Sequence, residues 1–257
     1  MGEKETATPE VDHDGAESCW SPNVNERRDG LKPTIIVLHY TGMADGEGAQ
    51  KWLCMPESEL SSHYIVHEDG RIVQMVSEAK RAWHAGQGSW HGQTDINSRS
   101  IGVEIVNEGH TRGSPEFPVK QIDAVIALCA GIMERHAISP ANVIGHSDMA
   151  PGRKFDPGEK FPWAVLAAAG VAVHVSPSLL SGGRFFSLGD VGQPVEALQS
   201  MLALYGFNQP VTGEYDEMTR THIHAFQMRQ RPERVDGIAD ASTITTLRDF
   251  LKRVTLT

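Results

Sequence analysis

The sequence has few cysteines, and their arrangement excludes two common small-domain scaffolds. Only Cys19, Cys54 and Cys129 occur among the 257 residues. An odd number at wide spacing resembles neither a disulfide framework nor a CxxC zinc site. We therefore expect plain thiols, with Cys129 buried in an apolar helical segment.

The sequence also lacks long hydrophobic runs and an excess of positive charge. No stretch approaches the roughly 18 apolar residues of a membrane-spanning helix, and the start lacks the apolar core of a secretory signal. The 23 Lys and Arg residues face 33 Asp and Glu residues, which gives a formal net charge of -10. Because nucleic-acid binding depends on basic residues that neutralise phosphates, we expect no nucleic-acid partner. The sequence indicates no oligomeric state.

Length and composition instead indicate two globular domains behind an acidic segment. Hydrophobic residues make up 40% and charged residues 22%, as in globular proteins. Residues 1–18 combine many carboxylates with few large apolar residues, which predicts disorder. Ser, Pro and Gly in residues 174–186 predict a linker. We expect a larger domain over residues 19–173 and a smaller one over residues 187–257.

The larger domain has the alternating strand and helix patterns of an α/β fold. Apolar or alternating segments predict strands at 34–38, 63–67, 71–76, 101–106 and 142–146, and helical periodicity predicts helices at 119–136 and 161–173. Asp69-Gly70 between two of these strands indicates a hairpin. Glu104 is predicted on the strand face opposite Ile101 and Ile105.

The smaller domain has the pattern of a three-helix bundle. Apolar stripes predict helices at 194–205, 216–229 and 241–250. Three short helices in about 70 residues can fold as a compact unit.

Two histidines and an aspartate form a candidate metal site. His39 and His146 each end a predicted strand, and Asp156 follows in a loop rich in Gly and Pro. Two imidazoles and a carboxylate suit Zn²⁺ and leave the fourth position open for water. However, the chain has twelve histidines and no compact motif such as HExxH, so spacing alone favours a structural role.

Two further residues are candidates for catalysis beside such a metal. Glu104 has the chemistry of a general base, and its alternative is a structural or solvent-facing carboxylate. Lys154 has the chemistry to stabilise an oxyanion, and its alternative is an ordinary surface lysine.

Five segments, in order, resemble the type-2 family of N-acetylmuramoyl-L-alanine amidases, the AmpD and AmiD group. They are residues 35–41 (IIVLHYT), 62–66 (SHYIV), 81–86 (RAWHAG), 100–104 (SIGVE) and 145–158 (GHSDMAPGRKFDPG). The long final motif is the most specific of them.

The resemblance implies a fold, a cofactor and a reaction. It implies a mixed central β-sheet flanked by helices, with one Zn²⁺ per chain held by His39, His146 and Asp156. Glu104 matches the catalytic glutamate of the family and Lys154 the lysine paired with it. The implied reaction is hydrolysis of the amide bond between the lactyl group of N-acetylmuramic acid and L-Ala, in bacterial cell-wall turnover or recycling.

Other residues are candidates for substrate contact. His84 lies in a family motif, with hydrogen bonding to neighbours an equal alternative. Trp83 and Trp90 are candidates for a sugar groove, although buried packing is the commoner fate of tryptophan. Asn107 and Arg99 flank the strand of Glu104 and are candidates for contact with the peptide.

The C-terminal region resembles the three-helix peptidoglycan-binding domain. The resemblance covers residues 187–251 and includes the segments 195–199 (VEALQ), 225–227 (AFQ) and 235–240 (VDGIAD). A tethered wall-binding domain would raise the concentration of an insoluble substrate near the catalytic domain.

Alternative functions follow from the same resemblance. One is a non-catalytic peptidoglycan-recognition protein of the same fold, and another is a wall anchor that needs only the C-terminal domain. Within the amidases, both soluble 1,6-anhydro-muropeptides and intact peptidoglycan are open as substrates. The lack of a visible signal peptide favours the cytoplasm, whereas the wall-binding domain favours the cell envelope with a signal already removed.

Overall fold

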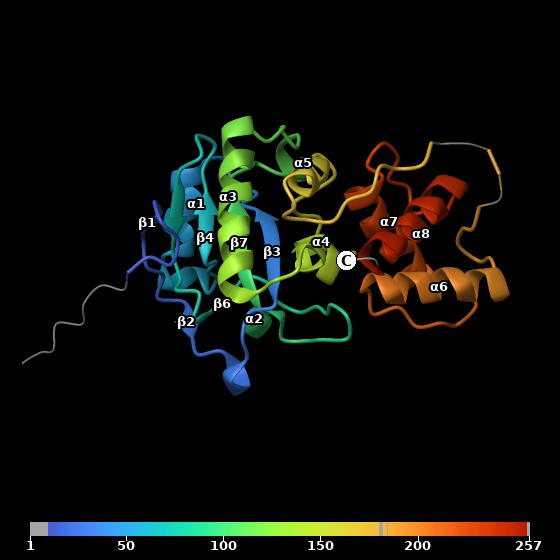
Figure 1. The fold of residues 1–257 in the computed structure, drawn as a ribbon, viewed down its shortest axis with the longest axis horizontal. Coiled ribbons are helices and arrows are strands. Elements are labelled where there is room, and N and C mark those ends of the chain that lie inside the picture. Colours follow the sequence, from blue (N-terminus) through green and yellow to red (C-terminus); the bar gives the residue numbers. More distant parts are fainter. Residues whose placement is uncertain (1–9, 180–181, 184, 256–257) are drawn as a thin grey trace, which may run out of the picture.

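The computed structural model describes residues 10–179, 182–183 and 185–255, with the elements labelled in Figure 1. The strands are β1 (Glu17–Ser18), β2 (Val24–Asn25), β3 (Ile35–Tyr40), β4 (Tyr64–Val66), β5 (Ile72–Gln74), β6 (Arg81–Ala82), β7 (Ser100–Ile105) and β8 (Val143–Gly145). The α-helices are α1 (Gly46–Leu53), α2 (Ile96–Arg99), α3 (Val119–His136), α4 (His146–Met149), α5 (Trp163–Ala168), α6 (Gln193–Tyr205), α7 (Glu217–Gln230) and α8 (Ala241–Thr255). Single 3₁₀ turns lie at Arg28–Gly30, Pro56–Ser58, His110–Arg112 and Pro140–Asn142.

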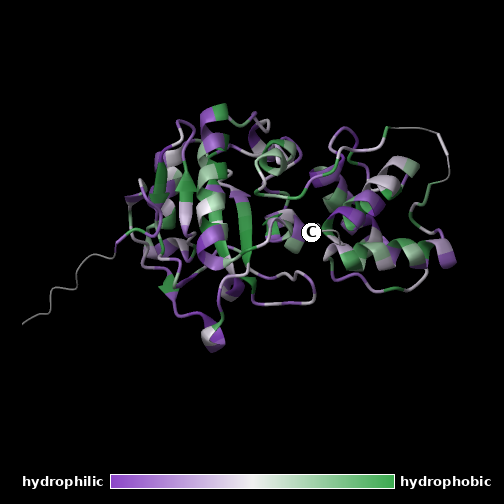
Figure 2. Ribbon diagram, in the orientation of Figure 1, coloured by the Kyte–Doolittle hydropathy of each residue, from purple (hydrophilic) through white to green (hydrophobic). Residues whose placement is uncertain are grey.

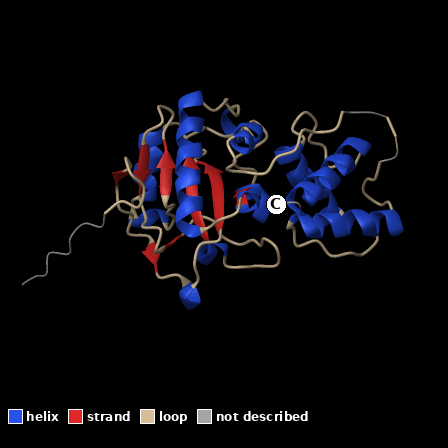
Figure 3. Cartoon of the chain, viewed as in Figure 1, coloured by secondary structure: helices blue, strands red, loops and turns tan. Residues whose placement is uncertain are grey.

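A mixed six-stranded sheet forms the centre of the larger domain, in the order β1-β5-β4-β7-β3-β8. β3 pairs in parallel with β7 and β8, while β4 and β5 form the predicted antiparallel hairpin. Figure 3 shows the strands between helices, with only helices in the C-terminal region. The predicted α/β class with a C-terminal helical bundle is therefore confirmed.

Alternation along β3 and β7 separates an apolar face from the face that carries His39 and Glu104. Figure 2 shows the long strand β3 largely green, and its hydrophobic side chains divide between two cores. Ile36 and Leu38 of β3 join Ile101 and Val103 of β7 in the core covered by α3. The opposite face therefore presents the side chains that lie between these positions, including His39 and Glu104.

Several predicted elements begin or end elsewhere, and the helix predicted at 241–250 continues to Thr255. The strand predicted at 142–146 ends at Gly145, and His146 begins α4. The helix predicted at 161–173 is the short α5, because Pro162 precedes it and Gly170 adopts a positive φ of 79° after it.

The N-terminal segment is partly ordered, in contrast to the predicted disorder. Residues 1–9 lie outside the described residues, but β1 pairs in parallel with β5. The Asp12 carboxylate accepts a hydrogen bond of 2.9 Å from the backbone N–H of Glu78, and the Asp12 N–H donates to Gln74 at 2.7 Å. These contacts attach an acidic segment to polar groups of the sheet edge.

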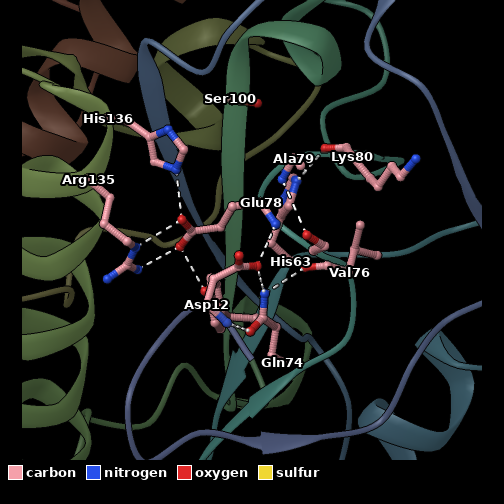
Figure 4. A network of polar contacts seen from close by, with 12 residues as sticks. Asp12, His63, Gln74, Val76, Glu78, Ala79, Lys80, Ser100, Arg135 and His136 are labelled. Carbon is pink, nitrogen blue, oxygen red and sulfur yellow. Dashed lines mark hydrogen bonds and ion pairs between the residues drawn. The ribbon is translucent and has the colours of Figure 1, made fainter. Parts of the chain in front are cut away.

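Glu78 is the centre of a buried polar network, drawn in Figure 4. Only 3% of it is exposed, and its carboxylate accepts hydrogen bonds from Tyr64 at 2.7 Å and from His136 at 2.7 Å. Arg135 donates two more, at 3.0 and 2.6 Å. Burial alone would raise the pKa of Glu78, but these donors lower it to about 2. The network joins the end of α3 to the sheet.

The C-terminal bundle is packed against the larger domain. One buried cluster contains Trp90, Ile144 and Met149 from the larger domain together with Leu198 and Phe226 from the bundle. Figure 1 shows the bundle beside α4. The stretch predicted as a linker runs along the bundle, where Ser178 bonds to Ser242 and Thr246 of α8, and residues 180–181 and 184 lie outside the described residues. The two units therefore share a core, which differs from the expectation of a tethered domain.

The cysteines lie partly as expected from the sequence. Cys129 is buried in α3, while the Sγ atoms of Cys19 and Cys54 lie 3.1 Å apart, a proximity that their spacing did not indicate.

Within the described ranges, no helix is both long and apolar enough to cross a membrane.

Candidate metal centre

Three predicted ligands converge at one end of the central sheet. His39 ends β3, His146 begins α4 directly after β8, and Asp156 lies in the following loop. The Nδ1 atoms of the two histidines are 2.9 Å apart, and each lies 3.0 Å from Oδ2 of Asp156. All three residues are buried, with 2%, 3% and 6% exposed. The parallel register brings them together, because Leu38 of β3 is paired with Gly145 of β8.

The hydrogen bond of His146 to the backbone determines which ring nitrogen carries its proton. Nε2 of His146 lies 2.9 Å from the carbonyl oxygen of Ala85. A carbonyl only accepts, so Nε2 is the protonated nitrogen and Nδ1 presents a lone pair to His39 and Asp156.

A longer chain of hydrogen bonds determines the tautomer of His39. The hydroxyl of Ser100 donates to the carbonyl of Ile96 at 2.7 Å, so it accepts from Nε2 of His84 at 3.2 Å. Nδ1 of His84 is then unprotonated and accepts the Nε2 proton of His39 at 2.9 Å. Nδ1 of His39 therefore also presents a lone pair.

Glycine at position 102 makes room for this chain. A Cβ atom on Gly102 would lie 2.5 Å from Cγ of His84, much closer than carbon atoms approach. The imidazole of His84 therefore packs directly on the backbone of β7.

The three facing atoms have the chemistry of a cation site. Burial and the neighbouring His146 lower the pKa of His39 to about 4, which leaves the imidazole neutral near pH 7. Asp156 supplies a carboxylate oxygen, Oδ2, that lies 3.0 Å from Nδ1 of each histidine. Two lone pairs and a carboxylate oxygen, with no proton between them, repel one another unless a cation lies among them. These residues can hold a metal ion.

Glu104 lies beside the centre on β7, directly opposite His39 in the strand register. Its Oε2 atom is buried and has no hydrogen-bond partner among the described residues. Burial and the charge of Asp156 raise the pKa of Glu104 well above its ordinary value, against the effect of Lys154. The carboxyl group is thus suited to exchange a proton with a bound molecule.

A cavity of about 370 Å³ opens over these residues. Its walls include Glu104 and the three convergent residues, with aromatic side chains and cations around them: Tyr40, Trp52, Trp83, His84, Arg153, Lys154 and Phe155. Trp83 and Lys154 therefore face the same cavity as the three convergent residues. His84 lines the cavity as well, but both of its ring nitrogens bond to neighbours.

Three other candidates for substrate contact lie outside this cavity lining. Arg99 donates to the carbonyl of Thr94 at 3.3 Å and precedes β7, at the opposite end of the strand from Glu104. The side chain of Asn107 bonds to Pro115 and Gly109 within its own loop. Trp90 is 3% exposed and packs against Tyr205 of the bundle.

Two residues have roles in the site that the sequence analysis does not predict. Ser100 ends the chain of hydrogen bonds from His39, although it begins a recognised motif. Arg153 donates from Nη2 to the carbonyl of Ala85 at 2.8 Å, the same oxygen that accepts from His146. Its position beside Lys154 in the long motif was the available signal.

Comparison with known families identifies two regions of the chain. A family model described as N-acetylmuramoyl-L-alanine amidase matches residues 29–159. A second, for a peptidoglycan binding domain, matches residues 191–247.

Individual relatives are similar over most of the chain. The chain is 36% identical over 234 residues to N-acetylmuramoyl-L-alanine amidase AmiD of Escherichia coli K12, across 85% of this chain and 82% of AmiD. It is 32% identical over 167 residues to 1,6-anhydro-N-acetylmuramyl-L-alanine amidase AmpD of the same organism, across 58% of this chain and 89% of AmpD.

Solved structures agree with these similarities. AmiD in complex with the substrate anhydro-N-acetylmuramic acid-L-Ala-D-gamma-Glu-L-Lys matches with a TM-score of 0.72 and 32% identity, over 89% of this chain and 93% of that one. AmpDh3 of Pseudomonas aeruginosa matches with a TM-score of 0.73 and 29% identity, over 90% and 96%.

Proposed function

The chain belongs to the N-acetylmuramoyl-L-alanine amidase family, and we propose that it works with one Zn²⁺ held by His39, His146 and Asp156. It is an amidase of peptidoglycan turnover and recycling. The bond that it hydrolyses joins the lactyl group of N-acetylmuramic acid to L-Ala.

The two histidine tautomers carry the proposal for the metal. Each Nδ1 lone pair is directed at Asp156 by a hydrogen bond on the other side of its ring, to Ala85 or to His84. Ligand histidines in zinc enzymes are oriented in this way by an acceptor for the second ring nitrogen. Two histidines and one carboxylate also form the protein ligand set of known catalytic zinc sites. When bound, Zn²⁺ would supply the Lewis acidity that activates water and polarises the substrate carbonyl.

Glu104 is the proton carrier in this proposal. Its carboxylate Oε2 takes the proton of the attacking water, and the carboxyl group then gives that proton to the nitrogen of the departing L-Ala. The raised pKa of Glu104 suits the second step, because a protonated carboxyl group must persist near neutral pH. One side chain thereby serves both proton transfers, and no covalent intermediate with the protein is needed.

Lys154 and the aromatic wall complete the proposed site. The Lys154 ammonium lies in the same cavity as Glu104, where it can stabilise the negative charge that develops on the carbonyl oxygen. Trp83 presents a partly exposed ring to the sugar or peptide. We propose N-acetylmuramoyl peptides as the substrate class, which includes the anhydro form bound by AmiD.

Mass spectrometry of products from defined muropeptides tests this function. The native protein should release free stem peptide and the lactyl sugar, a chelator should stop the release, and added Zn²⁺ should restore it. Parallel rates on anhydro-muropeptide and on purified sacculi would separate a recycling preference from a wall preference. Binding of wall material without any release of peptide would contradict catalysis and support the recognition-protein alternative.

A further inference from the structure

The strand that leads into His146 lies at an edge of the sheet. β8 pairs with β3 on one side, and no other strand of the described sheet flanks it. An edge strand leaves backbone groups unpaired by the sheet. Here Arg229 of α7 donates from Nη2 to the carbonyl oxygen of Val143 at 3.0 Å. The C-terminal bundle therefore supplies a partner for this edge.

The turn between β8 and α4 is held by Asp148. Oδ2 of Asp148 accepts a hydrogen bond of 2.8 Å from the backbone N–H of Gly145. His146 is the first residue of α4 and lies inside this turn. The direction of the His146 side chain thus depends on the position of the Asp148 carboxylate.

Two residues of the bundle hold Asp148 in turn. Nη1 of Arg229 lies 2.5 Å from Oδ2 of Asp148, and the hydroxyl of Tyr205 donates to Oδ1 at 3.2 Å. The Arg229 guanidinium also lies 4.1 Å from the centre of the Trp163 ring. The side chains of Arg229 and Asp148 are only 2% and 0% exposed. A buried carboxylate that loses its cation is strongly destabilised, so Asp148 would move if Arg229 were removed.

We propose that Arg229 and Tyr205 are positioning residues for the metal centre and act on His146 through Asp148. This inference rests on the proposed zinc function, because its consequence is a zinc affinity that depends on the docked bundle. The bundle then has a second role besides wall binding, as a structural support for the metal centre. The shared core around Met149 keeps the two units in this arrangement.

The zinc dissociation constant of the full chain tests the proposal, measured by competition with a chelating dye. Arg229→Met should raise the zinc dissociation constant by about tenfold. This is the lower end of the effect of losing a direct hydrogen-bond partner of a metal ligand, because Arg229 acts through Asp148. Arg229→Lys, which keeps the charge, should recover part of the affinity.

Arg231→Met is the matched control. Arg231 is also fully buried in the bundle, but it donates to Thr243 at 2.7 Å and lies 3.5 Å from Asp240, both inside the bundle. Its loss should lower the thermal stability of the protein while zinc affinity stays unchanged.

A second pair of substitutions changes the bundle less and tests the same proposal if Arg229→Met does not fold. Tyr205→Phe removes only the hydroxyl that contacts Asp148 and should raise the zinc dissociation constant by about two- to tenfold, the contribution of one hydrogen bond. Tyr215→Phe removes an equally buried hydroxyl that bonds to Gly237 within the bundle at 2.8 Å. This substitution should leave the zinc dissociation constant unchanged.

Two results would overturn the proposal. One is an unchanged zinc affinity in Arg229→Met and Tyr205→Phe, and the other is a loss of affinity that follows thermal stability equally in all variants. This inference alone would fail if the native protein binds zinc and cleaves muropeptide, but Arg229→Met and Tyr205→Phe have the same zinc affinity as their control variants. A native protein that binds no zinc would overturn the metal centre and this inference together.

Discussion

At the scale of single residues, the side chains of the proposed metal centre are held in one protonation state and one direction. The carbonyl of Ala85 orients His146, and His84 with Ser100 orients His39. Glu104 is the exception, because its Oε2 atom has no described protein partner and is available to a bound molecule. General base catalysis at a metal requires rigid metal ligands and a nearby carboxylate that is free to take up a proton.

Glu104→Gln should separate catalysis from metal binding. The amide keeps the shape of the side chain but cannot take up the proton of water, so we expect kcat to fall by about 10² to 10⁴. Zinc content, measured by metal analysis, should stay at one ion per chain. Asp156→Ala should instead lose the metal itself. Full activity in Glu104→Gln would show that another group carries the proton.

His84→Ala should weaken zinc binding without removing a ligand. Without His84, the Nε2 proton of His39 loses its acceptor, and we expect the zinc dissociation constant to rise about 10- to 100-fold. His67→Ala is the control, because His67 is also buried in the larger domain but bonds to Gln50 away from the site. An equal effect of both substitutions would indicate general destabilisation.

Sequence motifs identified the candidate ligands but not the partners that orient them. His39, His146 and Asp156 were predicted by resemblance, whereas His84 was left between substrate contact and hydrogen bonding. Its partner His39 lies 45 residues away, and only the folded sheet brings the two rings together. Arg229 gave no signal at all, since arginine on an amphipathic helix is usually exposed.

At the scale of elements, the register of β3 and β7 and the network on Glu78 define the frame around the site. The register places His39 opposite Glu104, while Glu78 joins α3 to the hairpin side of the sheet. A buried carboxylate with a depressed pKa stabilises the fold only while it is ionised.

The Glu78 network predicts a specific acid sensitivity. The pKa of Glu78 is about 2 in the folded chain and near its ordinary 4.5 when unfolded, so its contribution is complete above pH 4.5 and is lost as the pH falls toward 2. The loss should be about 3 kcal/mol in the free energy of unfolding. Denaturant unfolding over this pH range measures it.

Glu78→Gln should be less stable at neutral pH and should lose stability less steeply in acid. The same substitution at the exposed Glu57 is the control and should resemble the native protein. Identical pH dependence in Glu78→Gln and the native protein would show that this carboxylate is not the responsible group.

Long elements were predictable from the sequence, and short ones were not. The helix predicted at 119–136 coincides with α3, because eighteen residues carry a clear apolar period. The two-residue strands β1, β2 and β6 have too few residues to show any period. The helix α1 was missed for a different reason, since Gly46 and Gly48 reduce its helical propensity.

At the scale of the whole molecule, the two domains behave as one packed body. Trp90, a candidate for a sugar groove with buried packing as its alternative, packs against Tyr205 and Phe207 of the bundle. The sequence could not indicate this, because an apolar residue at a domain interface has the same pattern as one in a core. A flexible linker between the domains is predicted from the Ser- and Gly-rich composition of residues 174–186. That composition does not indicate whether the two domains pack against each other.

The most direct test of the metal centre is anomalous diffraction at the zinc absorption edge from crystals of the native protein. We expect one zinc peak per chain, about 2.0 to 2.2 Å from Nδ1 of His39, Nδ1 of His146 and Oδ2 of Asp156. The peak should disappear in Asp156→Ala. A zinc peak at other residues, or none at this position in protein that still cleaves muropeptide, would contradict the account.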